Sequence, residues 1–248
     1  MTAPGEEPRA TGAASRLCIA LDLASRNDVV AAARRFAPRA SWLKIGLEAF
    51  VSEGPSLVAD VAAAGARVFL DLKLHDIPNT VARAVSAAAA TGAAMVNVHA
   101  LGGREMLLAA RNAAGQSANR PLLIAVTLLT SLDSRALADL PVAGTPEGIA
   151  RRLAVLARDC GLDGVVCSPG DLPAIRSACG PSFLTVVPGI RPEGVDSGDQ
   201  KRTGTPGAAI AAGADILVVG RPVTAAADPD AALDALLAEI ESARMPSR

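Results

Sequence analysis

The stretch Phe69-Leu70-Asp71-Leu72-Lys73-Leu74-His75-Asp76-Ile77-Pro78-Asn79-Thr80 places three charges at the end of an apolar run. Such a run is typical of a buried strand. Side chains at i and i+2 of a strand face the same side, so Asp71 and Lys73 are predicted to project together. Asp76 follows the strand, where a loop can present it to the same site or to a neighbouring chain. The alternative is a structural ion pair, in which Asp71 and Lys73 only neutralise each other at the end of the strand. The rest of the chain distinguishes this alternative from a functional site.

Seven more apolar runs alternate with amphipathic, alanine-rich segments along the chain. The predicted strands are 17–23, 42–46, 67–73, 95–99, 122–128, 164–167, 184–187 and 216–219. The predicted helices are one capped by Asn27, then 56–64, 79–91, 104–114 with Gly115 as its stop, 146–160, 172–178, 207–212 and one starting at Asp228-Pro229. Eight strand–helix units without a break in composition predict a single α/β domain, a TIM (β/α)8 barrel over 16–248, after a disordered tail over 1–15. An open doubly wound sheet would need a glycine-rich turn after its first strand, and Asp22-Leu23-Ala24-Ser25 contains no glycine.

Composition excludes several classes of function. The 248 residues carry 24 basic and 25 acidic side chains, a net charge of −1, so we expect no nucleic-acid partner and no anionic membrane surface. No apolar stretch approaches the roughly 20 residues of a membrane span. The four cysteines show no C-x-x-C spacing and there are two histidines, so we expect no metal site, no disulfides and a cytoplasmic location. A dinucleotide or P-loop motif is also missing, which predicts that no cofactor is used.

Polar residues collect where the predicted strands end, which in such a barrel is where active sites are built. These residues are Asp22, Lys44, Asp71, Lys73, Asn97, His99, Thr127, Thr130, Ser168, Arg191, Gly220 and Arg221. Three successive strands contribute four charged side chains, Asp22, Lys44, Asp71 and Lys73. So many charges at one end of the barrel indicate a catalytic role rather than a packing role. Carboxylates beside Lys73 favour its cationic form, which suits a general acid that protonates a carbanion and not a Schiff-base nucleophile.

A phosphate site is predicted after strands seven and eight. Gly220-Arg221-Pro222 offers a backbone N–H, a guanidinium and a proline suited to a first helical turn. Arg191 and the loop through Gln200-Lys201-Arg202 lie next to it in the predicted barrel. By itself, the loop through Gln200-Lys201-Arg202 would be interpreted as a solvated surface loop. Because it lies beside Gly220-Arg221, it is interpreted as a mobile lid that binds the phosphate.

The run 71–80 resembles the signature of the orotidine 5'-phosphate decarboxylase family, in its bacterial form. Its flanks follow in the family's order: Leu21-Asp22, Leu43-Lys44-Ile45-Gly46, Leu128-Leu129-Thr130-Ser131, Pro188-Gly189-Ile190-Arg191 and Gly220-Arg221. The resemblance implies a cofactor-free and metal-free conversion of orotidine 5'-monophosphate to UMP and CO2, the last step of de novo UMP synthesis. It also implies a homodimer with its sites at the interface.

The resemblance also implies roles for individual residues. Lys44, Asp71, Lys73 and Asp76 would form a charged network, with Lys73 protonating C6 and Asp76 reaching the partner's site. The substrate would be held by Asp22, Lys44, Ile77, Thr80, Thr130, Arg191, Gln200, Gly220 and Arg221, with Thr80 again from the partner and Gln200 on the closing loop. His75 and His99 are interpreted as structural, Ser168 has no paired base in the sequence, and the cysteines are expected in the core.

Three alternatives remain at this point. Sugar-phosphate decarboxylases of a related barrel family share the D-x-K-x-x-D pattern, but they use a divalent metal and lack the Ile77-Pro78-Asn79-Thr80 continuation. A sugar-phosphate epimerase would need metal-binding histidines on several strands. A non-catalytic sensor of phosphate ligands would be expected to have lost part of the charged network, and none of it is missing.

Overall fold

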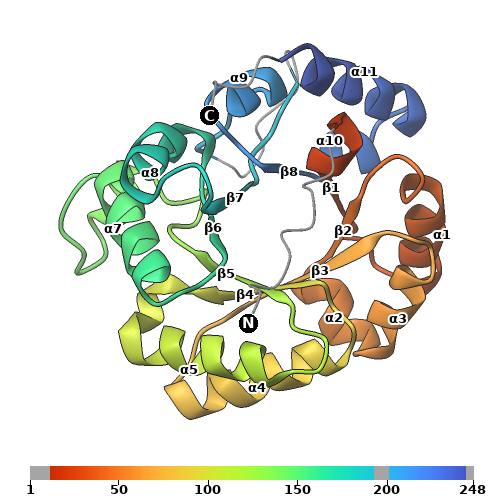
Figure 1. Cartoon of the computed structure of the whole chain (residues 1–248). Coiled ribbons are helices and arrows are strands. Elements are labelled where there is room, and N and C mark those ends of the chain that lie inside the picture. The colour runs from red at the N-terminus through yellow and green to blue at the C-terminus, as the bar shows by residue number, and fades with distance from the viewer. Residues whose placement is uncertain (1–11, 193–200, 244–248) are drawn as a thin grey trace, which may run out of the picture.

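The computed structural model describes residues 12–192 and 201–243, and within them eight parallel strands close into a barrel (Figure 1). Each strand pairs with the next in sequence, and β8 pairs with β1. The strands are β1 (Leu17–Ala20), β2 (Trp42–Ile45), β3 (Arg67–Leu74), β4 (Met95–His99), β5 (Leu122–Val126), β6 (Gly164–Val166), β7 (Leu184–Val187) and β8 (Ile216–Val219). The predicted (β/α)8 barrel is therefore confirmed.

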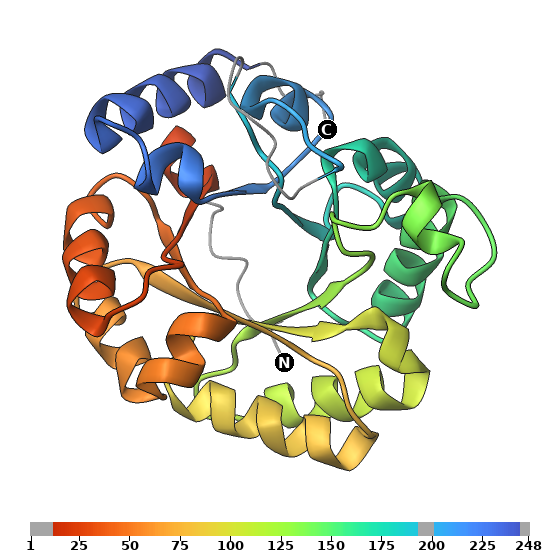
Figure 2. The ribbon, with the colours of Figure 1, turned by 180° about the vertical axis from the view of Figure 1, so that it is seen from behind.

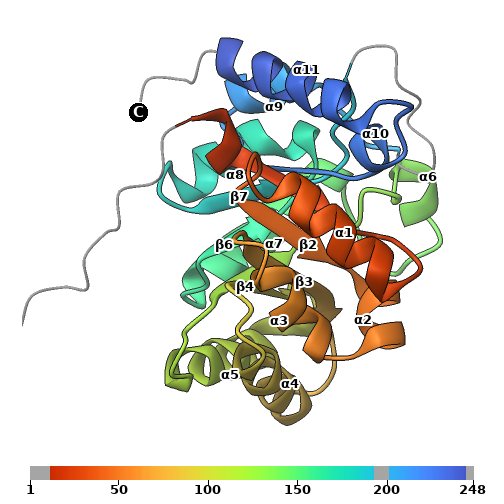
Figure 3. The ribbon, with the colours of Figure 1, turned by 90° about the vertical axis from the view of Figure 1, so that its right-hand side faces the viewer.

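Helices form a ring around the strands, as the views from both ends show (Figures 1 and 2). The α-helices are α1 (Arg26–Phe36), α2 (Leu47–Glu53), α3 (Ser56–Ala62), α4 (Pro78–Ala90), α5 (Gly103–Gln116), α6 (Ser134–Leu137), α7 (Pro146–Asp159), α8 (Leu172–Cys179), α9 (Pro206–Ala211), α10 (Arg221–Thr224) and α11 (Pro229–Ser242). The described ranges also contain the short 3-10 helices η1 (Ala13–Arg16), η2 (Ala100–Gly102) and η3 (Pro169–Asp171). The short helices α2, α6 and α10, which follow β2, β5 and β8, lie toward one end of the barrel (Figure 3).

Alternation along each strand divides the core into two layers. Inward-facing side chains fill the barrel, among them Trp42, Phe69 and Met95. Outward-facing side chains such as Leu43 and Leu70 pack against the helices in a larger cluster rich in alanine, valine and leucine. Because small side chains let helices approach the sheet closely, a barrel with few aromatic residues still has a continuous core.

Several predicted boundaries were wrong. Ser25, not Asn27, caps α1: its backbone is extended and its hydroxyl accepts a hydrogen bond from the Asp28 N–H at 3.2 Å. Gly115 does not stop α5, which continues to Gln116. The first residues of η1, assigned to the tail, are anchored to the barrel, because the Ala14 carbonyl accepts from the Ser41 N–H. Residues 1–11 of the predicted tail lie outside the described residues.

None of the helices in the two described ranges combines the length and the apolar character needed to cross a bilayer.

Candidate active site

A pocket of about 340 Å³ opens at the carboxyl ends of the strands, where the sequence predicted the site. Eight of the predicted site residues line it: Asp22, Lys44, Asp71, Lys73, Thr130, Arg191, Gly220 and Arg221. Apolar side chains from the barrel interior, including Phe69, Val126 and Val218, form part of its wall. The pocket therefore joins a charged side to an apolar side, as expected of a site for a ligand with both characters.

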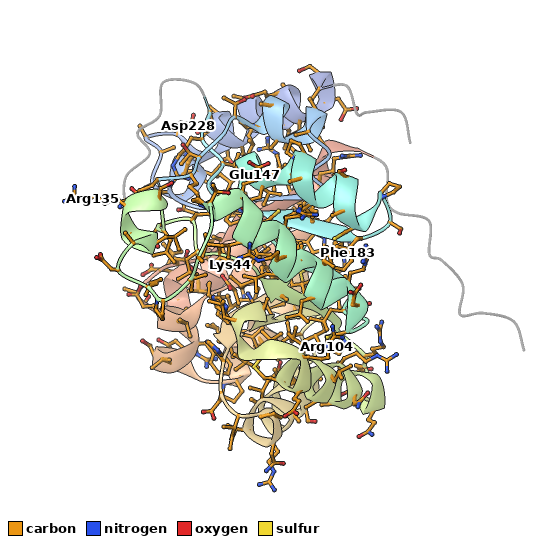
Figure 4. The ribbon with its side chains drawn as sticks, turned by 90° about the vertical axis from the view of Figure 1, so that its left-hand side faces the viewer. Lys44, Arg104, Arg135, Glu147, Phe183 and Asp228 are labelled. Atoms are coloured by element: carbon orange, nitrogen blue, oxygen red, sulfur yellow. The ribbon has the colours of Figure 1, made fainter. Side chains whose placement is uncertain are left out.

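Three strands build a continuous charged network on one side of this pocket. The Lys44 Nζ lies 2.8 Å from the Asp22 Oδ1 and 3.4 Å from the Asp71 Oδ2. The other carboxylate oxygen of Asp71 lies 2.7 Å from the Lys73 Nζ. Asp71 thus bridges two ammonium groups, and the prediction that Asp71 and Lys73 project together is confirmed. Figure 4 shows Lys44 within the body of the molecule, in contrast to Arg135 at its periphery.

Lys44 and Asp71, the two buried members of the network, stay charged although they are withdrawn from water. Burial by itself raises the pKa of the Asp71 carboxyl, but Lys44 and Lys73 outweigh burial and hold the pKa below its ordinary value. Burial likewise lowers the pKa of the Lys44 ammonium group, and the carboxylates of Asp71 and Asp22 reverse this effect and raise the pKa. At neutral pH the pocket therefore presents fixed positive and negative charges side by side.

Asn97, on β4, is a member of this network that the sequence placed at a strand end but not in the site. Its side chain is fully buried. Its Nδ2 donates to the Asp71 Oδ1 at 2.6 Å, and its Oδ1 accepts from the Lys73 backbone N–H at 2.8 Å. The signal in the sequence was a polar residue flanked by Val96 and Val98, in the strand that follows the one carrying Asp71 and Lys73.

The predicted phosphate side lies at the ends of β7 and β8. Arg191 follows β7, and Arg221 begins α10 with Pro222 in its first turn, as predicted. Both arginines and Gly220 line the pocket. A Cβ on Gly220 would meet the Ala20 Cβ at 3.4 Å, so the glycine backbone lies close against β1. Gln200 lies outside the described residues.

Lys201 and Arg202 lie on the loop interpreted as a phosphate lid, and both pair with carboxylates of the protein. The half-buried Arg202 guanidinium lies 2.9 Å from both carboxylate oxygens of Asp171 and donates to the Ser168 hydroxyl and to the Leu128 carbonyl. Lys201 pairs with Asp133 at 3.1 Å. Arg202 therefore ties the segment after β7 to the loops after β5 and β6. The Ser168 hydroxyl therefore has a structural partner in Arg202.

Three predicted residues do not reach the pocket of their own chain. Asp76, Ile77 and Thr80 are exposed and are not among its lining residues. Asp76 Oδ1 accepts from the Ile77 N–H at 2.6 Å, and Ile77 itself is 67% exposed. The assignment of Ile77 to substrate binding therefore does not hold within a single chain.

The two histidines stack on each other beside the network, with ring centroids 5.2 Å apart. Burial lowers the pKa of His99 to about 4, and the nearby charges of His75 and Lys73 add to this effect. The His99 Nδ1 accepts from the Leu101 N–H at 3.4 Å, which is a structural role. Neither ring lines the pocket.

The cysteines are unpaired, and three of them, Cys18, Cys160 and Cys167, are buried, while Cys179 is half-buried. Burial raises the pKa of all four thiols. Within 12–192 and 201–243, no three histidine, cysteine, aspartate or glutamate side chains gather as metal ligands would.

The fold and the site together define a class: a (β/α)8-barrel with a buried lysine–aspartate network and two arginines lining one pocket. Residues 15–236 match the model of the Orotidine 5'-phosphate decarboxylase / HUMPS family. The chain belongs to this family.

Named relatives agree with this assignment. The chain is 52% identical over 230 residues to the orotidine 5'-phosphate decarboxylase of Sodalis glossinidius, covering 92% of this chain and 91% of the relative. It is 54% identical over 226 residues to that of Alkalilimnicola ehrlichii, covering 91% and 96%. A crystal structure of orotidine 5'-phosphate decarboxylase from Lactobacillus acidophilus is 34% identical with a TM-score of 0.77, covering 91% of this chain and 99% of that one. A conserved protein from Geobacillus kaustophilus is 41% identical with a TM-score of 0.78, covering 90% and 99%.

Proposed function

We propose that this chain decarboxylates orotidine 5'-monophosphate to UMP and CO2, the last step of de novo UMP synthesis. The observation that carries the proposal is the Lys44–Asp71–Lys73 network, lying in one pocket with Arg191 and Arg221. The names of the relatives point to the same reaction. The free thiols suit a cytoplasmic enzyme.

In this mechanism the phosphate binds at Arg191, Gly220 and Arg221, with Gln200 on the closing loop. Guanidinium groups suit this role because they form bidentate, charge-assisted hydrogen bonds with phosphate oxygens. Asp22 and Lys44 hold ribose hydroxyls, and Thr130 contacts the pyrimidine. The ring then lies with C6 toward Lys73, because the charged network occupies that side of the pocket.

The chemical step breaks the bond between C6 and its carboxylate carbon. The electron pair of that bond stays on C6 and the carboxylate leaves as CO2. The Lys73 ammonium group donates a proton to C6, giving UMP, and the neutral lysine regains a proton from solvent. Fixed charges that are already in place stabilise the developing carbanion without reorganisation, which is the main source of catalysis in such sites.

The chain is proposed to act as a homodimer in which Asp76 and Thr80 enter the partner's site. Their exposure outside their own pocket supports this arrangement. Large apolar side chains are also exposed on the segments that follow β2, β3 and β4: Leu47 and Val51 on α2, Ile77, and Leu101. Because β2, β3 and β4 are neighbours in the barrel, we propose that these segments contribute to one apolar face that is buried between two subunits.

The test of the reaction is the ultraviolet absorbance of orotidine 5'-monophosphate incubated with purified protein in excess EDTA. Loss of the orotate chromophore, with UMP as the product, is the expected result. No reaction in EDTA, combined with magnesium-dependent turnover of a keto-sugar phosphate, would instead assign the chain to the metal-dependent alternative. Nucleotide binding with neither reaction would indicate a sensor.

The shared site is tested by mixing two inactive variants, Lys73→Ala and Asp76→Ala. If Asp76 serves the partner, a hybrid dimer has one site with both substitutions and one with neither. An equal mixture that exchanges subunits should then regain about a quarter of wild-type activity, by random pairing in a two-fold dimer. If Asp76 acts in its own subunit, every site stays defective and no activity returns.

A further inference from the structure

Asn97 lies on β4, next to β3, the strand that carries Asp71 and Lys73. It lies in the middle of β4 between the outward-facing Val96 and Val98, so its own side chain points into the barrel. There it makes two hydrogen bonds, one to the Asp71 carboxylate and one from the Lys73 backbone N–H. The second bond fixes the orientation of the amide, since a backbone N–H needs an oxygen opposite it.

The backbone of Lys73 is also unusual. Its φ of 51° is left-handed, and no other non-glycine residue in the described ranges has a positive φ. A residue with a Cβ adopts this conformation only where the surroundings enforce it, and such residues cluster at functional sites. The regular path of β3 is therefore broken at the residue proposed to donate the proton.

The pairing of β3 with β4 shows why the backbone departs from a regular strand here. Leu70 pairs with Val96 and Leu74 pairs with Val98, so four steps along β3 correspond to two steps along β4. The extra residues of this bulge cannot all reach a backbone partner on β4. The side chain of Asn97 supplies the acceptor that the ladder lacks at Lys73.

We propose that Asn97 is a positioning residue for decarboxylation: it holds Lys73 in its left-handed conformation and orients Asp71, and so aims the Lys73 ammonium group at the reacting carbon. This inference rests on the proposed function of the same pocket. Asparagine suits both tasks because it offers a donor to a carboxylate and an acceptor to an N–H, with no charge. Aspartate would lack the donor, and leucine would lack both groups.

The proposal predicts an effect on the rate of reaction rather than on binding. Arg191 and Arg221, which are proposed to hold the phosphate, come from the segments after β7 and β8, whereas Asn97 lies on β4 on the side of the charged network. Proton transfer, in contrast, depends on the alignment of donor and acceptor, and a displacement of about 1 Å can lower a rate about 100-fold.

The experiment compares Asn97→Ala with a matched control, Thr127→Val, by steady-state kinetics, UMP affinity and thermal unfolding. Thr127 is also fully buried and also makes a buried hydrogen bond, to the Val166 carbonyl at 2.9 Å, but it does not line the pocket. Both variants should lose stability, and Asn97→Ala should lose more because it gives up two buried hydrogen bonds where Thr127→Val gives up one. Asn97→Ala should lower kcat about 100-fold with UMP affinity unchanged within about threefold, and Thr127→Val should keep its kcat.

A second variant separates the two hydrogen bonds of Asn97. Asn97→Asp keeps the acceptor for the Lys73 N–H but places a second carboxylate against Asp71. Its kcat relative to wild type should rise toward acid pH, because a protonated carboxyl can again donate to Asp71. A purely structural defect would give no such recovery relative to wild type.

The outcomes are distinguishable from failure of the proposed function. An inactive wild-type protein would refute the decarboxylase assignment. An active wild type with equal kcat losses in Asn97→Ala and Thr127→Val would refute the role of Asn97. A crystal structure of Asn97→Ala decides independently of activity: Lys73 should leave the left-handed region, and a retained positive φ would overturn the proposal.

Discussion

Gly46 is required by the charged network for a steric reason, and the substitution Gly46→Ala tests that network without touching a charge. The φ of Gly46 is −89°, so its backbone suits any residue. A Cβ at this position would lie 2.5 Å from the Asp22 Oδ1 and 3.0 Å from the Lys44 Nζ. Because non-bonded atoms prefer separations of about 3.5 Å, the Asp22 carboxylate must withdraw by roughly 1 Å.

The withdrawal separates Asp22 from Lys44 but leaves the fold intact. The Asp22 side chain is 54% exposed and can turn into water, whereas the Lys44 side chain is 10% exposed and cannot. Loss of the 2.8 Å contact destabilises the fold by about 1 kcal/mol, the upper end for a partly exposed ion pair. Replacing glycine by alanine offsets this by about 0.4–1 kcal/mol through the unfolded chain. The melting temperature should therefore change little.

Substrate binding should respond much more strongly than stability. Asp22 and Lys44 are proposed to hold the ribose, and a hydrogen bond to a charged group contributes about 1.5–3 kcal/mol. The expected result is a KM for orotidine 5'-monophosphate that rises about 10- to 150-fold. Steady-state kinetics and differential scanning calorimetry on the same preparation measure both quantities.

Gly115→Ala is the matched control, because a Cβ there meets no atom within 4 Å and the residue lies inside α5. It should gain about 0.5–1 kcal/mol of stability and keep its KM. A KM for Gly46→Ala within twofold of wild type would refute the steric argument and the ribose role of Asp22 together.

Three further changes have defined outcomes. Lys73→Ala should abolish turnover while UMP still binds in calorimetry, and near-normal turnover would contradict its role as proton donor. Arg221→Ala should weaken binding by about 1.5–3 kcal/mol, with a larger loss of activity on orotidine 5'-monophosphate than on a substrate lacking phosphate; equal losses would argue against a phosphate contact. The pKa of His99 is lowered to about 4 in the folded protein, whereas in the unfolded chain it is about 6.5. As the pH falls from about 6.5 to about 4, the unfolded chain binds a proton at His99 that the folded protein does not bind, so the free energy of unfolding decreases over this range. His99→Gln should flatten the free energy of unfolding in this range, measured by urea titration, and an unchanged slope would contradict the lowered pKa.

Arg202 illustrates how tertiary contacts decide which partner a polar side chain has. In the sequence, Arg202 follows a charged loop beside two phosphate-binding candidates. In the fold, its guanidinium reaches Asp171 and the carbonyls of Leu128 and Leu129, and these contacts leave it outside the pocket. An arginine is long enough to turn either way, so its partner depends on where a distant carboxylate lies.

The sequence by itself determined the barrel and the position of its site. Alternating apolar runs and amphipathic segments specify strands and helices through their periods, and parallel strands joined by helices leave their carboxyl ends at one face. Asp22, Lys44, Asp71 and Lys73 were therefore predictable as neighbours. Helix ends were less predictable, as at Ser25 and Gly115, because several nearby residues can satisfy the same terminal groups.

Only the tertiary structure decided how these groups are held. Lys73 adopts its left-handed φ where the register of β3 against β4 shifts, and the side chain of Asn97 accepts from its N–H there. The need for glycine at 46 depends on an aspartate from another strand that lies 2.5 Å from where a Cβ would be. Such constraints depend on contacts between residues that are far apart in the chain, and the local sequence does not show how close those residues lie in the fold.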